Sequence, residues 1–99
     1  MKLFVDDKRT PPDKGFECVE DYEGAVFLLK YMDFDFVTLD YDLGDGNTGL
    51  DILKFMNENK KYPSHLNIHS DHPEGSVLMR KYAEEHFPVT VRVTMNRNN

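Results

Sequence analysis

Residues 36–49, FVTLDYDLGDGNTG, constrain the fold of this chain more than any other stretch. A run of apolar and β-branched residues leads into an acidic turn in which Asp40 and Asp42 lie two positions apart. Glycines then lead into a helical pattern that begins at Leu50. A buried strand that passes through acids and glycines into a helix is the usual construction of an α/β ligand site.

A second acidic strand end lies near the start of the chain. Lys2–Val5 is a short, continuous apolar run, which is typical of a parallel strand covered on both faces, and Asp6 and Asp7 follow it directly. Because neighbouring parallel strands end at the same sheet edge, the acids of the two strands should meet there. The sequence therefore predicts one shared metal or phosphate site.

The remaining pattern alternates strands and helices along the chain. The predicted strands are Lys2–Val5, Phe16–Val19, 34–39, 66–68 and 88–94, with helices after Asp21, Thr48 and Pro73. Pro11 and Pro12 exclude a helix from the first connection. This order predicts a doubly wound, three-layer α/β fold: a parallel sheet in the order 2-1-3-4-5 with helices on both faces, its first helix replaced by a proline loop. The last strand, which alternates Val89, Val91 and Val93, should lie at an edge, and residues 95–99 should fray.

Size and charge limit the range of functions. A chain of 99 residues should form a single domain, and the formal net charge of −6 disfavours an extended nucleic-acid surface or an anionic membrane as a partner. No segment approaches the length and apolarity of a membrane span. The lone cysteine, Cys18, excludes an internal disulfide, so a cytoplasmic location and a small buried thiol are expected.

The acids at the two strand ends are candidate metal ligands. Asp6, Asp7, Asp40 and Asp42 offer carboxylate oxygens, which suit Mg²⁺ or Mn²⁺, and without a cation they would repel one another. The alternative is that they only cap helices and solvate turns.

Two histidines and an arginine are the other candidates. His69 and His72, after the fourth strand, could move protons or orient a phosphate; alternatively, His69 is a hydrogen-bonded wall residue and His72 a helix cap. Arg9 could bind a phosphate or form a salt bridge with the nearby acids.

These features resemble the receiver domain, the phosphoacceptor module of two-component signalling. The resemblance implies Mg²⁺ held by Asp6, Asp7, Asp40 and the backbone carbonyl of Asp42. Asp40 would also be the phosphoacceptor, and Ser70 would contact the phosphoryl group. Receivers carry a helix between their first two strands and a Lys-Pro pair after strand five. Here the first is a proline loop, no lysine follows Glu84, and Arg92 or Arg97 could replace the lysine only in charge.

Three separated motifs are closer to a divergent group, the cyclic-phosphate processing receiver domains. They are LFVDDKRTPP, LDYDLG followed by TG, and IHSDHPEG followed by Met79. That group often has His where this chain has Tyr41, and Asn where it has His72.

The resemblance implies divalent-metal-dependent processing of a small phosphate or cyclic phosphate ester, or of an RNA end. Asp40 would be nucleophile or metal ligand and His69 the acid/base, with His72 beside it. Two alternatives stay open: a stand-alone receiver phosphorylated on Asp40, and a degenerate receiver that only mediates interactions. The oligomeric state is left undetermined.

Overall fold

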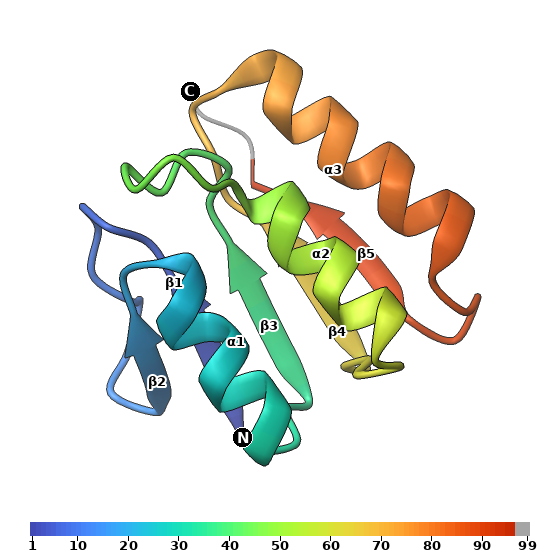
Figure 1. Cartoon of the computed structure of the whole chain (residues 1–99), viewed down its shortest axis with the longest axis horizontal. Helices are drawn as coiled ribbons and strands as arrows, with labels where there is room; N and C mark the ends of the chain where they lie inside the picture. The colour runs from blue at the N-terminus through green and yellow to red at the C-terminus, as the bar shows by residue number, and fades with distance from the viewer. Residues whose placement is uncertain (97–99) are drawn as a thin grey trace.

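The computed structural model describes residues 1–96, and five strands among them form one parallel sheet (Figure 1). The strands are β1 (Lys2–Val5), β2 (Phe16–Val19), β3 (Phe36–Leu39), β4 (His65–Ile68) and β5 (Arg92–Met95). The helices are α1 (Tyr22–Tyr31), α2 (Gly49–Glu58) and α3 (Pro73–His86). The sheet order is β2-β1-β3-β4-β5, which confirms the predicted order.

Each helix begins at a residue whose side chain satisfies a free backbone N–H group. Asp21 caps α1 by accepting a hydrogen bond from the Gly24 amide at 2.8 Å, and Thr48 forms a capping box with Asp51 at the start of α2. The sequence pattern placed the start of both helices directly after these two residues. No helix within residues 1–96 has the length and apolarity needed to cross a membrane.

All three helices lie on the same face of the sheet, in front of it in Figure 1, and α2 contacts both α1 and α3. The reason is the handedness of the connections. The β2–β3, β3–β4 and β4–β5 connections all step across the sheet in one direction, and right-handed crossovers then place their helices on one side. Only the β1–β2 connection steps the other way, and it is the proline loop. The expectation of helices on both faces is therefore wrong for the described residues.

The hydrophobic core lies between the sheet and this single helical layer. The strands contribute Leu3, Val5, Val37, Leu39, Leu66 and Ile68, and the helices contribute Ala25, Leu29, Ile52, Leu53, Met56, Met79 and Ala83. Because side chains alternate along a strand, the intervening positions, such as Phe4 and Phe36, face away from the helices. The continuous apolar run of β1 thus does not reflect helices on both of its faces.

The C-terminal strand differs from its prediction. Residues 88–91 form a turn closed by a hydrogen bond from the Val91 amide to the Pro88 carbonyl at 3.0 Å, and Val89 is fully exposed. The strand begins at Arg92 and includes Met95, which the sequence analysis assigned to a fraying tail. The rest of that tail, residues 97–99, lies outside the described residues. β3 likewise begins two residues later than predicted.

Cys18 is exposed, contrary to the prediction of a buried thiol, because β2 is an edge strand and its burial is slight. We therefore expect Ellman's reagent to modify Cys18 in the folded protein about as fast as in urea, whereas a buried thiol reacts only after unfolding. The rate of thionitrobenzoate release with and without urea measures this, and Cys18→Ser is the blank. Strong protection in the folded protein would contradict the exposed position.

Candidate metal and phosphate site

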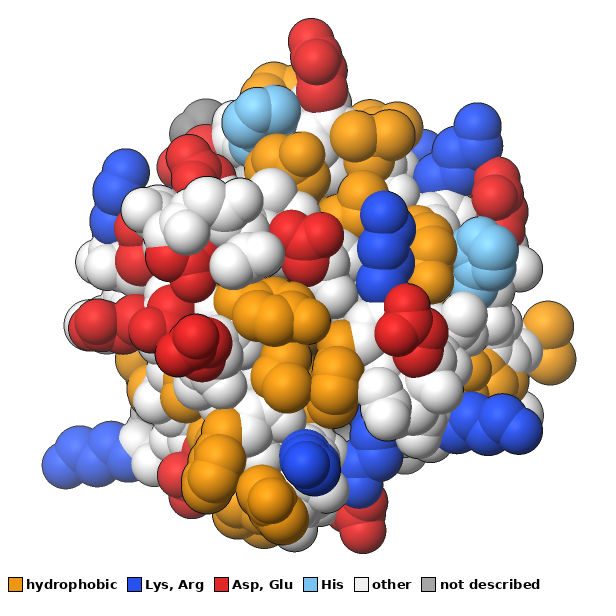
Figure 2. Space-filling view, in the orientation of Figure 1, with side chains coloured by type: hydrophobic (Ala, Val, Ile, Leu, Met, Phe, Trp, Pro, Cys, Tyr) orange, Lys and Arg blue, Asp and Glu red, His pale blue; other side chains and the backbone are white. Residues whose placement is uncertain are grey.

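Three carboxylates meet at the carboxyl edge of the sheet. Asp6 and Asp7 follow β1, Asp40 follows β3, and the pairing of Val5 with Leu39 puts the two strand ends side by side. One oxygen from each carboxylate lies within 4.8 Å of the others. The structure therefore brings together three of the four predicted metal ligands, and acidic side chains gather over the loops at this edge (Figure 2).

Asp6 is buried and held from several sides. Its Oδ1 accepts hydrogen bonds from the backbone amides of Lys8 (2.8 Å) and Arg9 (3.0 Å), and its Oδ2 lies 3.0 Å from His69 Nε2. Burial raises the pKa of Asp6, but these hydrogen bonds outweigh burial and leave the pKa below its ordinary value. Asp6 is thus a fixed, ionised carboxylate.

Asp7 has the feature that best fits a metal site. Its Oδ1 is buried and has no hydrogen-bond partner among the described residues. A buried acceptor left in this state costs roughly 1–3 kcal/mol, and more when it is charged. A methyl group on Gly44 would lie 2.7 Å from Asp7 Oδ2, so glycine there also leaves room for this carboxylate. A hard cation between the three aspartates would satisfy the orphaned oxygen, so the residues present fit Mg²⁺ or Mn²⁺.

Asp40 has a raised pKa, which means that its surroundings disfavour the ionised carboxylate. Burial raises its pKa and the neighbouring charge of Asp6 adds to this, while hydrogen bonds from Ser70 and the Tyr41 amide oppose it. The net direction is upward. A cation at the cluster would favour the ionised form and reverse that direction.

Asp42, the fourth predicted ligand, has its side chain outside the three-carboxylate cluster. The side chain is exposed, and its Oδ1 accepts a hydrogen bond from the Gly44 amide at 3.0 Å. Asp42 still lines a hollow of about 260 Å³ together with Asp6, Asp7, Asp40, Arg9, Ser70 and His72. The receiver resemblance implies the backbone carbonyl of Asp42, and not this side chain, as a ligand.

Arg9 forms one wall of the hollow. Its Nη2 donates to Asp71 Oδ2, and its Nε lies 4.0 Å from Asp6 Oδ2, so the ion-pair alternative of the sequence analysis is present. Asp71, which lies within the third motif between Ser70 and His72, was not among the predicted site residues. An acid that follows a histidine and a serine after a predicted strand is the signal that could have identified it.

His69 is a buried residue within a hydrogen-bond network. Burial lowers its pKa, although Asp6 opposes the effect, so the ring is neutral. Asp6 can only accept, so the Nε2 of His69 carries the proton, and its Nδ1 accepts from the Thr38 hydroxyl at 2.6 Å. Asn67 donates in turn to that hydroxyl at 2.9 Å. Both ring nitrogens are engaged, which favours the wall-residue alternative; Thr38 and Asn67 were missed because they look like ordinary strand residues.

His72 and Ser70 line the same hollow as Arg9. His72 Nδ1 accepts the Gly75 amide proton at 2.9 Å and so caps α3, which leaves the Nε2 of the neutral ring as a donor. The ring of His72 packs on Tyr41, with centroids 4.7 Å apart. The Oγ of Ser70 accepts from the His72 amide at 3.1 Å, and its side chain also hydrogen-bonds Asp40.

Two motif glycines allow the close packing behind the site. A methyl group on Gly49 would lie 2.2 Å from the Asp40 carbonyl oxygen and 2.5 Å from Met79. One on Gly75 would lie 2.3 Å from the ring of Tyr41. Packing against Asp40 therefore requires glycine at position 49, and packing against Tyr41 requires glycine at position 75.

No lysine follows β5 within the described residues, so the receiver lysine has no equivalent at that position. Asn96 follows β5, and Arg92 pairs with His65 at the other end of the strand, level with Phe36 rather than with the acids. The suggestion that Arg92 replaces the lysine is therefore wrong. Arg97 lies outside the described residues.

A five-stranded parallel sheet in the order 2-1-3-4-5, with clustered carboxylates after the first and third strands, defines a receiver-like α/β protein. Within that class, the family model of the cyclic-phosphate processing receiver domain matches residues 1–85. The chain belongs to this family, as its motifs indicated. Comparisons with curated proteins and with solved structures gave no match.

Proposed function

We propose that Asp6, Asp7 and Asp40 hold a divalent cation, Mg²⁺ or Mn²⁺, and that this site processes a phosphate or cyclic phosphate ester. The observation that carries the proposal is the buried, unpaired Oδ1 of Asp7 within a cluster of three carboxylates. When bound, the cation supplies positive charge opposite the negative charge that develops on the reacting phosphoryl group.

The walls of the hollow provide the groups that a phosphate ester requires. Arg9 presents a partly exposed guanidinium that can exchange its bond to Asp71 for one to a phosphate oxygen. The Nε2–H of His72 can donate to an ester oxygen, and the hydroxyl of Ser70 can exchange its hydrogen bond to Asp40 for one to a phosphoryl oxygen. Asp40 lines the same hollow, and we assign it the role of nucleophile or metal ligand.

His69 is proposed to be a positioning residue. Its Nε2–H fixes one oxygen of Asp6, and Thr38 fixes the ring from behind. A His69→Ala change should therefore lower metal affinity as well as turnover, whereas a residue acting only as proton donor would leave metal affinity intact. Rescue of metal affinity by His69→Gln, which can still donate to Asp6, would separate positioning from a loss of folding.

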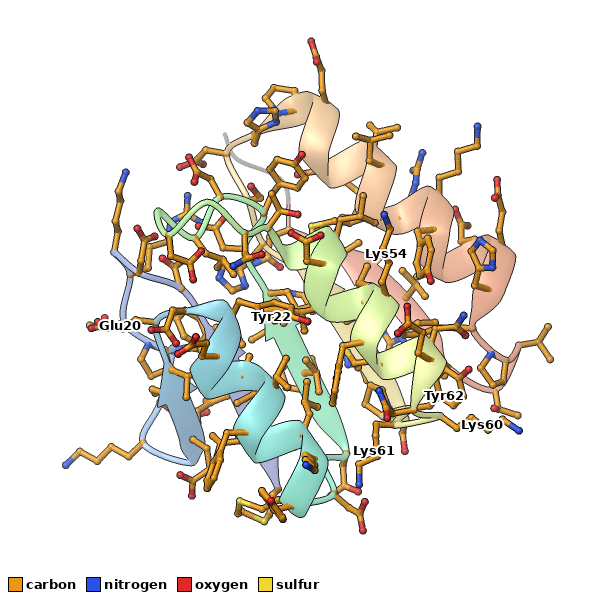
Figure 3. The ribbon with its side chains drawn as sticks, viewed as in Figure 1. Glu20, Tyr22, Lys54, Lys60, Lys61 and Tyr62 are labelled. Carbon is orange, nitrogen blue, oxygen red and sulfur yellow. The ribbon has the colours of Figure 1, made fainter. Side chains whose placement is uncertain are left out.

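Turnover on a substrate panel tests the proposed reaction. We expect hydrolysis of at least one 2′,3′-cyclic nucleotide or terminal phosphate in Mn²⁺ or Mg²⁺, none in EDTA, and for Asp40→Asn a rate equal to that in EDTA. Phosphate release and chromatography of the products measure this. Lys54→Ala, on an exposed position of α2 away from the site, is the matched control (Figure 3). Metal-independent turnover, or full activity of Asp40→Asn, would contradict the proposal.

The alternative of a stand-alone receiver is tested separately. Without the receiver lysine after β5, Asp40 should be phosphorylated poorly by acetyl phosphate and Mg²⁺, because charge on the incoming phosphoryl group lacks its usual partner. Intact-mass measurement is expected to show little adduct. A stoichiometric adduct in the wild type that is lost in Asp40→Asn would favour the signalling role instead.

A further inference from the structure

The sheet face opposite the helices contains a second hollow, of about 540 Å³, which is larger than the acidic one. Ligand pockets for small molecules usually measure about 300–1,000 Å³. This hollow exists because the β1–β2 connection is a loop, so no helix among residues 1–96 covers this face. The side chains of Phe16, Phe36 and His65 form its floor at one end.

The floor is an aromatic row that runs across three strands. Strand register places Phe16 and Phe36 on either side of Lys2, and His65 beside Phe36. The ring centroids of Phe16 and Phe36 are 5.7 Å apart, and those of Phe36 and His65 are 4.6 Å apart. All three rings are only partly buried. Partly exposed rings on an open sheet face are a platform on which a planar heterocycle can stack.

Polar side chains lie beside these rings. The Thr94 hydroxyl donates to Asn67 Oδ1 at 2.8 Å and lies 2.6 Å from His65 Nε2, while Asn67 donates to Thr38. This series of hydrogen bonds continues through Thr38 to His69 and so reaches Asp6. The amide and hydroxyl groups give the hollow donors and acceptors at the edge of a stacked ring, which a purely apolar protein interface would not need.

The charge of the hollow is opposite to that of the chain. Its lining within residues 1–96 includes Arg9 and Arg92 but no aspartate or glutamate, although the net charge of the chain is −6. A second copy of this chain docked face to face would bring these arginines toward one another without a carboxylate between them. The hollow is thus suited to a ligand that is anionic or rich in acceptors.

Arg9 and His69 connect this hollow to the metal and phosphate site. Arg9 lines both hollows, and His69 lines the open-face hollow while holding Asp6 on its other side. Along β3, Phe36 and Asp40 are four residues apart, a distance of about 13 Å. A single nucleotide extended along the strand could therefore place its phosphate at the acids and its base over the aromatic row.

We propose that the open sheet face binds the base and ribose of a ribonucleotide whose phosphate occupies the acidic site. The proposal rests on the proposed function for the placement of the phosphate, and it adds the substrate class: a nucleotide rather than a sugar phosphate or inorganic phosphate. Phe36 and His65 stack against the base, and Arg92, Asn67 and Thr94 contact its polar edge.

Binding measured with three probes tests the proposal: adenosine 3′-monophosphate, ribose 5-phosphate and adenosine, each by calorimetry and by amide chemical shifts. Stacking contributes roughly 1–3 kcal/mol per base, so the nucleotide should bind at least about tenfold more tightly than ribose 5-phosphate. Phe36→Leu should remove that advantage, and Phe16→Leu, at the sheet edge, should reduce it. Phe27→Ala is the control, because Phe27 is an exposed aromatic of α1 on the helical side.

The outcomes separate this inference from the proposed function. Adenosine alone, without metal, should shift the amide signals of β3 and β4, and this result would support the base site even if no phosphate ester is hydrolysed. Equal affinity for the nucleotide and ribose 5-phosphate would overturn the inference even if both are hydrolysed. A dimer in sedimentation that Phe36→Leu dissociates would also overturn it, in favour of a second copy on this face.

Discussion

Asp7→Asn should abolish the rise in melting temperature that Mg²⁺ produces in the wild type. A cation that binds only the folded state stabilises it by roughly 2.7 kcal/mol at a hundredfold excess over its dissociation constant. Asp7 Oδ1 is the buried oxygen that this cation would satisfy, and an asparagine removes its charge. Without metal, the variant should melt at or above the wild-type temperature, because repulsion among the three carboxylates falls.

Asp42→Asn is the matched control for this experiment. Asp42 lies in the same acidic region, but its side chain is exposed and outside the cluster, and asparagine can still accept from the Gly44 amide. Its response to Mg²⁺ in a thermal melt should match the wild type. If Asp7→Asn kept the full Mg²⁺-dependent rise in melting temperature, Asp7 would not be a metal ligand. If Asp42→Asn lost that rise, the carboxylate of Asp42 would be a ligand after all.

Gly49→Ala should destabilise the protein, although alanine is the better helix former by about 1 kcal/mol. The new methyl group would lie 2.2 Å from the Asp40 carbonyl oxygen, a backbone atom that cannot move aside alone. Overpacking of this kind typically costs about 1–3 kcal/mol. The midpoint of urea unfolding measures the effect, and the Mg²⁺ response should weaken as well because Asp40 is displaced.

Lys54→Ala is the control in the same helix, since Lys54 is exposed and its replacement should leave the urea midpoint nearly unchanged. If Gly49→Ala were as stable as the wild type, or more so, the close approach of α2 to Asp40 would be refuted. A destabilised variant with an intact Mg²⁺ response would confine the effect of Gly49 to packing.

The strand order and the meeting of Asp6, Asp7 and Asp40 were predictable from the sequence for a simple reason. These acids follow apolar strands directly. Once the strands and their order are predicted, the residues at their carboxyl ends must lie together at one edge of the sheet. The caps at Asp21 and Thr48 were predictable in the same way, because a cap depends on a few neighbouring residues.

What the sequence did not predict depends on contacts between distant segments. The hydrogen bond between Thr38 and His69 joins β3 to the end of the neighbouring strand β4, and the bond between Arg9 and Asp71 joins two loops that are 62 residues apart in the sequence. Cys18 has a pattern typical of a buried strand, but its exposure follows from the position of β2 at the edge. The single helical layer was predictable in principle, because it follows from crossover handedness once the first helix is replaced by a loop.

The proline loop between β1 and β2 also has a consequence for how this scaffold can change. Because handedness assigns every other connection between strands to the helical side, an insertion in this loop is the one that would fold back over the open face. A short loop leaves the aromatic row accessible to solvent, whereas a helix grafted into this loop would bury the row in a second hydrophobic core. Shortening or lengthening one surface segment could thus add or remove a binding function without altering the carboxylates at the sheet edge.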